Sequence, residues 1–295
     1  MFEMLINPKS DEKRPWKMFF IGLLYAFLSL VLVKIFFGDD FVLSQYSGMI
    51  VVTFCVMFSL PFMYYMIKEE EEEDEQIEGF FRVWKTHKDS MFAFLWLFFG
   101  FVVAFSFFFV LFGDSTLFNA QIGTYCMINS PGNFEGCVGE YSFEKVFTPT
   151  GAATEGVRFL SIIENNVFVM IFTLVFSLIF GAGAIFVLAW NASVIAAAIG
   201  MFTKYHLSEI PCGLIRYMIH GFPEIAAYFV TALAGGIFGA GVIRNGLRSP
   251  KNLKVFENVM ILIFISIIFL AIAGLIEVYF TPNVMSFLSK IKICG

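Results

Sequence analysis

The sequence predicts an all-α polytopic integral membrane protein with about seven transmembrane or half-membrane helices and one extracytoplasmic loop domain. Of its 295 residues, 59% are hydrophobic and 19% are aromatic. Soluble domains average roughly 45–50% apolar residues, and several apolar stretches here exceed the roughly eighteen residues that mark a membrane helix. The lipid bilayer is therefore the predicted environment, and soluble enzymes are disfavoured.

Seven apolar stretches follow one another along the chain. The second contains Pro61, where we expect a kink. The fifth is too short for a full crossing, because roughly twenty residues are needed. It is a half-span, an arm of a re-entrant hairpin, or the core of a longer tilted helix. The stretches are 18–37, 41–67, 91–112, 166–189, 191–202, 217–243 and 255–280.

The distribution of lysine and arginine predicts the orientation. If the N-terminus is cytoplasmic and the fifth stretch crosses, most of the 19 basic residues fall in cytoplasmic segments. If that stretch turned back, the basic 244–254 loop would lie outside. We therefore expect seven crossings in a multi-pass protein of the cell membrane. The first stretch is too long for a signal peptide and lacks a cleavage site, so we expect it to be retained.

Three regions follow from this topology. Residues 1–112 form an N-terminal three-span region, residues 113–165 an extracytoplasmic loop, and residues 166–295 a C-terminal membrane core. The cytoplasmic acidic loop is 68–90. The outer loop is polar, and we expect one short helix near 141–146.

The acidic loop explains the net charge of −5, because seven acids lie in the run 69–75. This run is more typical of a solvated extension of the second span than of a docking or cation-binding site. The residues after it, with Phe80, Phe81 and Trp84 among bases, predict a helix in the membrane interface. The charge gives no indication of nucleic-acid binding.

The cysteines support the predicted topology. Cys126, Cys137, Cys212 and Cys294 all fall outside, where an even number of cysteines suggests pairing. Cys126 and Cys137 flank one turn-rich loop and form the first predicted disulfide. A Cys212–Cys294 bond is the weaker second expectation, and unpaired thiols are the alternative.

Two spans carry stripes of small and polar residues. In the fourth, Asn166, Met170, Thr173, Ser177, Gly181 and Ala184 fall on one helix face. In the sixth, His220, Glu224, Tyr228, Thr231, Gly235 and Gly239 do so if the helix is continuous. We expect the two stripes to pack against each other. The glycines expected to pack the helices are Gly181, Gly183, Gly235, Gly236 and Gly239.

Pro223 complicates the sixth span. Proline suits a first helical turn and disrupts an interior one, so the helix either continues or breaks at 220–222 and restarts at Pro223. In both cases His220 and Glu224 lie close together near the outer boundary. Asn165 and Asn166 should lie at the same level. Asn191 should lie near the opposite face, at the turn between the fourth and fifth spans.

These five residues, Asn165, Asn166, Asn191, His220 and Glu224, form the candidate intramembrane polar site. Polar groups in hydrocarbon are costly and often functional, so a proton, cation or substrate site is one interpretation. The other is structural, with Glu224 accepting hydrogen bonds that lock the bundle. One histidine and one glutamate are too few ligands for a closed zinc site, so we expect no metal.

Enzyme signatures are absent from the sequence. It contains no H-E-x-x-H, no G-x-S-x-G and no P-loop. We therefore expect no catalytic residues and no cofactor.

The C-terminal half resembles the stage II sporulation protein M family over roughly 160–245. The order of motifs carries this resemblance: Glu164-Asn165-Asn166, Phe180-Gly181-Ala182-Gly183, Trp190-Asn191, His220-Gly221 with Glu224, and Gly235-Gly236-Ile237-Phe238-Gly239. In spore-forming bacteria the resemblance implies a membrane protein that recruits and holds cell-wall hydrolases. Relatives also occur in archaea that make no spores, so it implies a core architecture and self-association, and not sporulation.

Two functions follow. The first is a non-enzymatic membrane scaffold or assembly protein that forms a homodimer and docks an extracytoplasmic protein partner through its loops. The second is a transporter or channel whose path is lined by the polar site around His220 and Glu224. No charge reaches the middle of the membrane, which favours the scaffold slightly.

Overall fold

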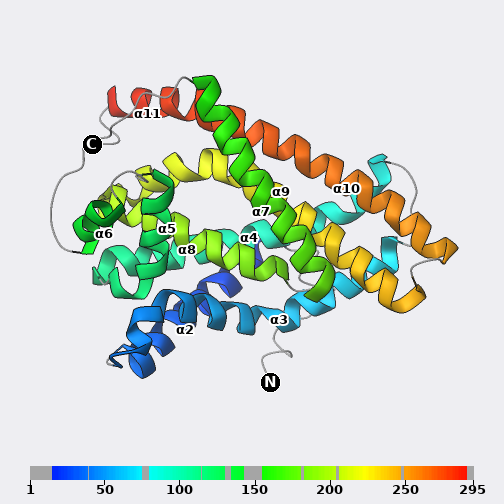
Figure 1. Ribbon diagram of the computed structural model, residues 1–295, viewed down its shortest axis with the longest axis horizontal. Coiled ribbons are helices and arrows are strands. Elements are labelled where there is room, and N and C mark those ends of the chain that lie inside the picture. Colours follow the sequence, from blue (N-terminus) through cyan, green and yellow to red (C-terminus); the bar gives the residue numbers. More distant parts are fainter. Residues whose placement is uncertain are drawn as a thin grey trace.

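Helices make up every regular element that the structure describes. This computed structural model describes residues 15–38, 40–74, 80–113, 115–129, 134–142, 155–180, 183–203, 206–246 and 249–290. The elements (Figure 1) are α2 Lys17–Phe37, η2 Leu43–Tyr46, α3 Ser47–Asp74, α4 Phe80–Phe112, η3 Ser115–Phe118, α5 Asn119–Asn129, α6 Phe134–Ser142, α7 Glu155–Phe180, α8 Gly183–Thr203, η5 Leu207–Glu209, α9 Ile210–Asn245, α10 Pro250–Leu275, η6 Ile276–Phe280 and α11 Thr281–Lys290.

The predicted polytopic all-α class is confirmed. Six helices are long and apolar enough to cross a membrane, and α7 adds the shorter apolar segment Ile162–Leu178. A chain in hydrocarbon must satisfy its backbone polar groups internally, and an α-helix does so within one segment. This requirement explains why the long apolar stretches fold as helices.

The predicted boundary between the fourth and fifth spans is wrong. The helices are α7, which ends at Phe180, and α8, which begins at Gly183, so Trp190 and Asn191 lie inside α8. Glycine is a poor helix former, and the glycine-rich 181–183 segment separates the two helices better than Trp190-Asn191 does. With 21 residues, α8 is long enough for a full crossing, and the half-span and re-entrant alternatives are wrong.

The ends of the bundle also differ from the predictions. Helix α3 continues to Asp74, so the described part of the acidic run is the predicted extension of the second span. The predicted interfacial helix is instead the first part of α4, which runs on into the third span and buries Val83 and His87. This end of α4 therefore packs on the protein and does not lie flat on lipid.

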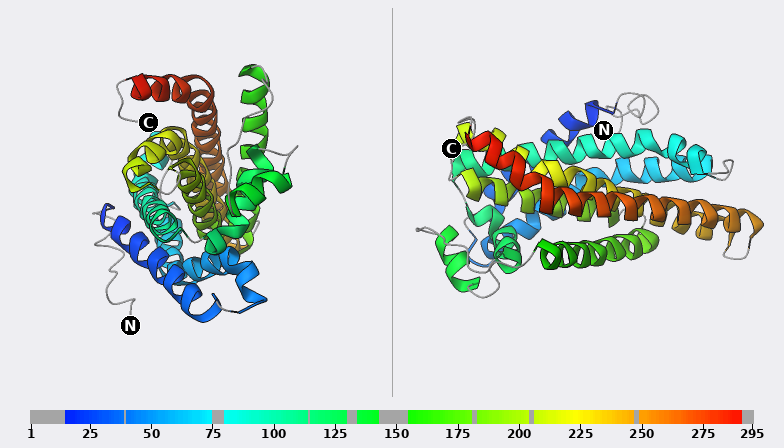
Figure 2. Two further views of the ribbon diagram at one scale, coloured as in Figure 1. Left: turned by 90° about the vertical axis from the view of Figure 1, so that its left-hand side faces the viewer. Right: turned by 90° about the horizontal axis from the view of Figure 1, so that it is seen from above.

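The outer loop contains more helix than predicted. Helices α5 and α6 lie between the third and fourth spans, and α7 already begins at Glu155. Most of the predicted helix near 141–146 lies outside the described residues. Figure 1 places α5, α6 and α11 at one end of the bundle, which Figure 2 (left) views end-on. We call α5 and α6 the outer unit.

Helix α9 lies at the centre of the bundle. It contacts α10, α7, α8, α3 and α4. Its residues from Ile225 to Ile237 are buried on every face, and the ring of Phe229 contacts that of Phe94 on α4. By contrast, α2 lies at the edge and leaves Phe20, Leu24 and Phe27 exposed. The polar stripe of α9 is therefore enclosed by protein over most of its length.

Candidate functional site

The predicted seam between the fourth and sixth spans is the contact between α7 and α9. A Cβ placed on Gly235 would lie 2.7 Å from the carbonyl oxygen of Leu174, and one on Gly239 would lie 2.5 Å from that of Leu178. Only glycine permits so close an approach of two backbones. This seam is therefore occupied by two helices of one chain.

The α7 side of the seam matches its predicted stripe. Asn166, Met170, Thr173 and Ser177 are buried, whereas Phe168 on the opposite face is 66% exposed. Small and weakly polar side chains thus face α9, and large apolar ones face outward, toward lipid in a membrane.

The remaining packing glycines are less well defined. Gly236 is buried within α9, and Gly183 is the first residue of α8. Gly181 lies outside the described residues. A packing role for these three glycines stays a prediction.

Helix α9 continues through Pro223 without a break, so of the two alternatives the continuous helix is correct. A proline removes one backbone hydrogen bond, but packing on neighbouring helices keeps such helices intact in membranes. The continuous helix places His220, Glu224 and Tyr228 one turn apart on one face. The Tyr228 hydroxyl donates a hydrogen bond to Oε1 of Glu224 at 3.0 Å.

A π-turn brings further polar groups to this face. The segment Ile276–Phe280 is a π-helix between α10 and α11, and such turns are frequent at functional sites. The Thr281 hydroxyl lies 3.4 Å from Nδ1 of His220 and donates a hydrogen bond to the Ile276 carbonyl at 3.1 Å. Glu277 lies one turn before Thr281, and Glu224 lies one turn after His220. Because α9 and α10 are antiparallel, the two glutamates lie at the same level and interact electrostatically.

The site therefore contains two carboxylates, because Glu277 lies within electrostatic range of Glu224. His220, Glu224 and Glu277 are all half-buried. Neither Glu277 nor Thr281 was among the predicted site residues. A usable signal existed, since Glu277 is an ionisable residue inside the last apolar stretch, where such residues are rare and costly.

None of the described hydrogen bonds of the three asparagines reaches this group. Asn165 donates to Oδ1 of Asn166 at 3.2 Å, and Asn165 itself is exposed. Asn191 lies in the middle of α8 and donates to the carbonyl of Val187 on its own helix at 2.7 Å. The prediction that Asn191 lies at an inter-span turn is wrong because that turn falls earlier in the chain. The Asn191 side chain therefore bonds to the backbone of its own helix.

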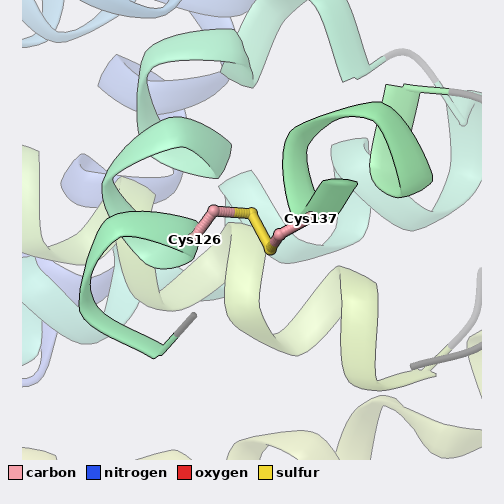
Figure 3. The surroundings of a disulfide bond; sticks show 2 residues. All are labelled: Cys126 and Cys137. Atoms are coloured by element: carbon pink, nitrogen blue, oxygen red, sulfur yellow. A yellow bond between two sulfur atoms is a disulfide. The ribbon is translucent and has the colours of Figure 1, made fainter. Parts of the chain in front are cut away.

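The outer unit is cross-linked by the predicted disulfide. Cys126 on α5 and Cys137 on α6 form it, with Cα atoms 5.7 Å apart (Figure 3). Cys212 near the start of α9 is also disulfide-bonded, and its predicted partner Cys294 lies outside the described residues. Cys55 is a free, buried thiol.

Two α5 side chains fasten the outer unit to the membrane helices. The fully buried Gln121 amide donates to the Gly48 carbonyl of α3 at 3.0 Å and to the Ser193 hydroxyl of α8 at 3.1 Å. Asn119 donates to the carbonyl of Gln45 in η2. One helix of the outer loop is thus bonded to two spans and to the turn between α2 and α3.

No group of three His, Cys, Asp or Glu side chains with metal-binding geometry occurs among the described residues. His87 is buried in α4 and His206 is exposed beside η5, so neither completes a set with His220.

The family model of stage II sporulation protein M matches residues 95–282, which is more than half of the chain. The chain belongs to the stage II sporulation protein M family. The match begins in α4 and ends in α11, so the family core includes the third span and the outer unit. It is therefore larger than the 160–245 segment that carries the sequence resemblance.

One relative of this family member is an uncharacterized protein of Methanocaldococcus jannaschii. The two are 32% identical over 136 residues, which cover 44% of this chain and 75% of the relative. No solved structure matches the chain.

Proposed function

We propose that this protein is a non-enzymatic membrane scaffold that presents its outer unit to an extracytoplasmic protein partner. The observation that carries the proposal is that the outer unit is held by two kinds of bond, a disulfide within it and hydrogen bonds to the membrane helices. The Cys126–Cys137 bond joins α5 to α6, and Gln121 joins α5 to α3 and α8. A docking surface that is already ordered loses less conformational entropy when a partner binds.

The proposal places the protein in the cell membrane with its N-terminus in the cytoplasm. The excess of lysine and arginine at the opposite end from the outer unit supports this orientation. Disulfides persist in oxidising compartments, and Cys126, Cys137 and Cys212 all belong to segments at the outer end in this topology. Self-association as a homodimer is part of the proposal, through a surface other than the α7–α9 seam.

The scaffold proposal is tested by altering the exposed apolar side chains of the outer unit. Met127 is 64% exposed and Phe134 is 38% exposed. A Met127→Glu/Phe134→Glu variant should lose partners from a cross-linked pull-down quantified by mass spectrometry. Leu207→Glu, an exposed position outside the outer unit, is the matched control. An identical set of partners in wild type and the double variant would contradict the proposal.

A proton- or ion-coupled transporter is the second candidate function. The observation that favours it is the pair of carboxylates, Glu224 and Glu277, beside His220 within the α9 and α10 spans. Ionisable groups in such positions often mark ion pathways. Glu224→Gln should abolish coupled flux in proteoliposomes, whereas Glu164→Gln, an exposed control on α7, should retain it. Unchanged flux in Glu224→Gln would count against transport.

A further inference from the structure

Arg216 is an exposed cation of α9 that lies against aromatic rings. Its guanidinium carbon is 4.8 Å from the ring centre of Phe202 on α8 and 5.8 Å from that of Tyr217. A guanidinium within about 6 Å of a ring centre is attracted to the negative face of the ring. The two rings therefore restrain the position of a charged group that remains accessible.

The N–H groups of this guanidinium are available to a ligand. Arginine carries five N–H donors in a planar fork. None of the five has a hydrogen-bond acceptor or an ion-pair partner among the residues that the structure describes. The acids that precede and follow Arg216 in the sequence, Glu209 and Glu224, lie seven and eight residues away, which is about 10 Å or more along a helix. The rings position the fork, and an anion from outside the described chain can accept its hydrogen bonds.

The Phe202 ring sets the level of Arg216 in the membrane. Helix α8 has 21 residues and rises about 30 Å, which is the thickness of the hydrocarbon core. Phe202 is the last residue but one of this helix. Its ring therefore lies where the hydrocarbon ends and the headgroup layer begins. Arg216, which packs on this ring, faces the layer in which phospholipids carry their phosphates.

A second cation lies on aromatic rings at the same rim of the bundle. Lys34 is in the last turn of α2, and its nitrogen is 5.2 Å from the ring centre of Phe112, the last residue of α4. The ends of α4 and α8 adjoin, because a Cβ on Gly200 would meet the Phe109 ring. Phe109 also contacts Phe118, the residue before α5, so this rim belongs to the outer end. Both cations favour an anionic lipid surface at this rim.

We propose that Arg216, restrained by Phe202 and Tyr217, binds the phosphate of an anionic phospholipid in the leaflet at the outer end. A guanidinium fork pairs with phosphate through two parallel N–H···O hydrogen bonds, which makes arginine the side chain suited to such a contact. An anionic headgroup carries no ammonium group to compete for that phosphate, whereas a zwitterionic headgroup does. The inference depends on neither proposed function, because it requires only that these helices lie in a membrane.

The first experiment counts the lipids that stay bound to the full chain in native mass spectrometry. The protein is released from nanodiscs that contain phosphatidylglycerol and phosphatidylcholine in equal amounts. Wild type should retain the anionic lipid in preference to the zwitterionic one, and equal retention would overturn the proposal. Arg216→Gln should weaken phosphatidylglycerol binding about tenfold, as expected for the loss of charged hydrogen bonds. Unchanged binding in this variant would also overturn it.

Three further variants separate this site from general attraction between charges. Lys290→Gln removes an exposed cation of α11 that lies on no ring of the described residues, and this variant should bind lipid as wild type does. Arg216→Lys keeps the charge but loses the fork, and Phe202→Leu removes the ring, so both should give intermediate losses. A loss in Lys290→Gln equal to that in Arg216→Gln would show that only net charge matters and would overturn the site.

The last comparisons distinguish a lipid from free phosphate and binding from folding. A large excess of inorganic phosphate should displace no more phosphatidylglycerol from the wild type than sodium chloride of equal ionic strength does. Greater displacement by phosphate would assign Arg216 to a soluble anion and overturn the lipid as its ligand. In lipid-free detergent, Arg216→Gln should unfold at the wild-type temperature, because its side chain is exposed. Added phosphatidylglycerol should then stabilise the wild type more than the variant, and equal stabilisation would contradict the proposal.

Discussion

The α7–α9 seam and the outer end of the bundle are held together by different means. In the seam, Gly235 and Gly239 meet backbone carbonyls of α7. At the outer end, a disulfide, the Gln121 amide and the contact between Thr281 and His220 join the elements. Lipid provides no hydrophobic force between helices, so close packing must join them there. At the outer end of the bundle, hydrogen bonds and a disulfide can hold the elements together.

The largest expected effect comes from adding one carbon atom to the seam. In Gly235→Ala the new Cβ would lie 2.7 Å from the Leu174 carbonyl oxygen, which cannot move aside without its helix. We expect a loss of about 3 kcal/mol, at the upper end of overpacking costs. The measurement is thermal unfolding of the purified protein in detergent.

Gly221→Ala on the same helix is the matched control. Its Cβ would have 3.5 Å to the nearest atom, the Cε of Met218, so the greater helix propensity of alanine should stabilise by up to about 1 kcal/mol. Opposite signs for the two variants are the expected result. Two changes of the same sign would show that backbone contact does not dominate the seam.

Removing the disulfide should give the second largest effect, confined to the outer unit. The Cys126→Ser/Cys137→Ser variant opens a loop with a sequence separation of 11, and loops of this size lose about 2 to 3 kcal/mol. Amide hydrogen exchange should rise in α5 and α6 and stay unchanged in α8. Faster exchange throughout α8 would mean that the two regions unfold together.

Gln121→Leu should have a smaller effect on the same unit. The variant leaves the Gly48 carbonyl without its amide donor, at a cost of about 1–2 kcal/mol. Thr124→Val is the control, because the Thr124 hydroxyl bonds only to the Ala120 carbonyl of its own helix. Hydrogen exchange of α5 should accelerate in the first variant much more than in the second.

The smallest expected effect is at the π-turn. Thr281→Val removes the hydroxyl near His220 and should cost about 0.5–1 kcal/mol, as for one ordinary hydrogen bond. Asn283→Ala, whose amide bonds to the Tyr279 carbonyl at an exposed position, should cost less. The nitrogen chemical shifts of His220 should change only in the first variant. A change in both variants would show that a rearranged π-turn, and not the lost Thr281 hydroxyl, alters the His220 chemical shifts.

Much of the fold could be predicted because hydrophobicity and small-residue spacing act locally. The seven apolar stretches and the Thr173–Ser177 and Gly235–Gly239 faces depend only on helix period and lipid. The α7–α8 boundary could not be placed, since apolar residues continue through Trp190 and hide the glycine signal. Local propensity also suggested a break at Pro223, which packing around the central helix overrides.

The candidate site was only half predictable. His220 and Glu224 stand out because they share a turn and interrupt an apolar stretch. Their partners Glu277 and Thr281 come from a distant segment, and the π-turn that presents them leaves no mark in the periodicity of the sequence. Asn191 matched the family motif but serves its own helix, which spacing alone could not reveal.

The length of α3 sets the distance between the acidic run and the last buried turn of the bundle. From the buried Met66 to Asp74 the helix rises about 12 Å, whereas Glu69 lies only about 5 Å along the axis from Met66. At physiological salt, charges are screened over about 8 Å. The first acids of the run therefore still act on charged groups at the level of Met66, whereas Asp74 is largely screened from them. Raising the ionic strength should weaken the influence of the first acids and leave that of Asp74 almost unchanged.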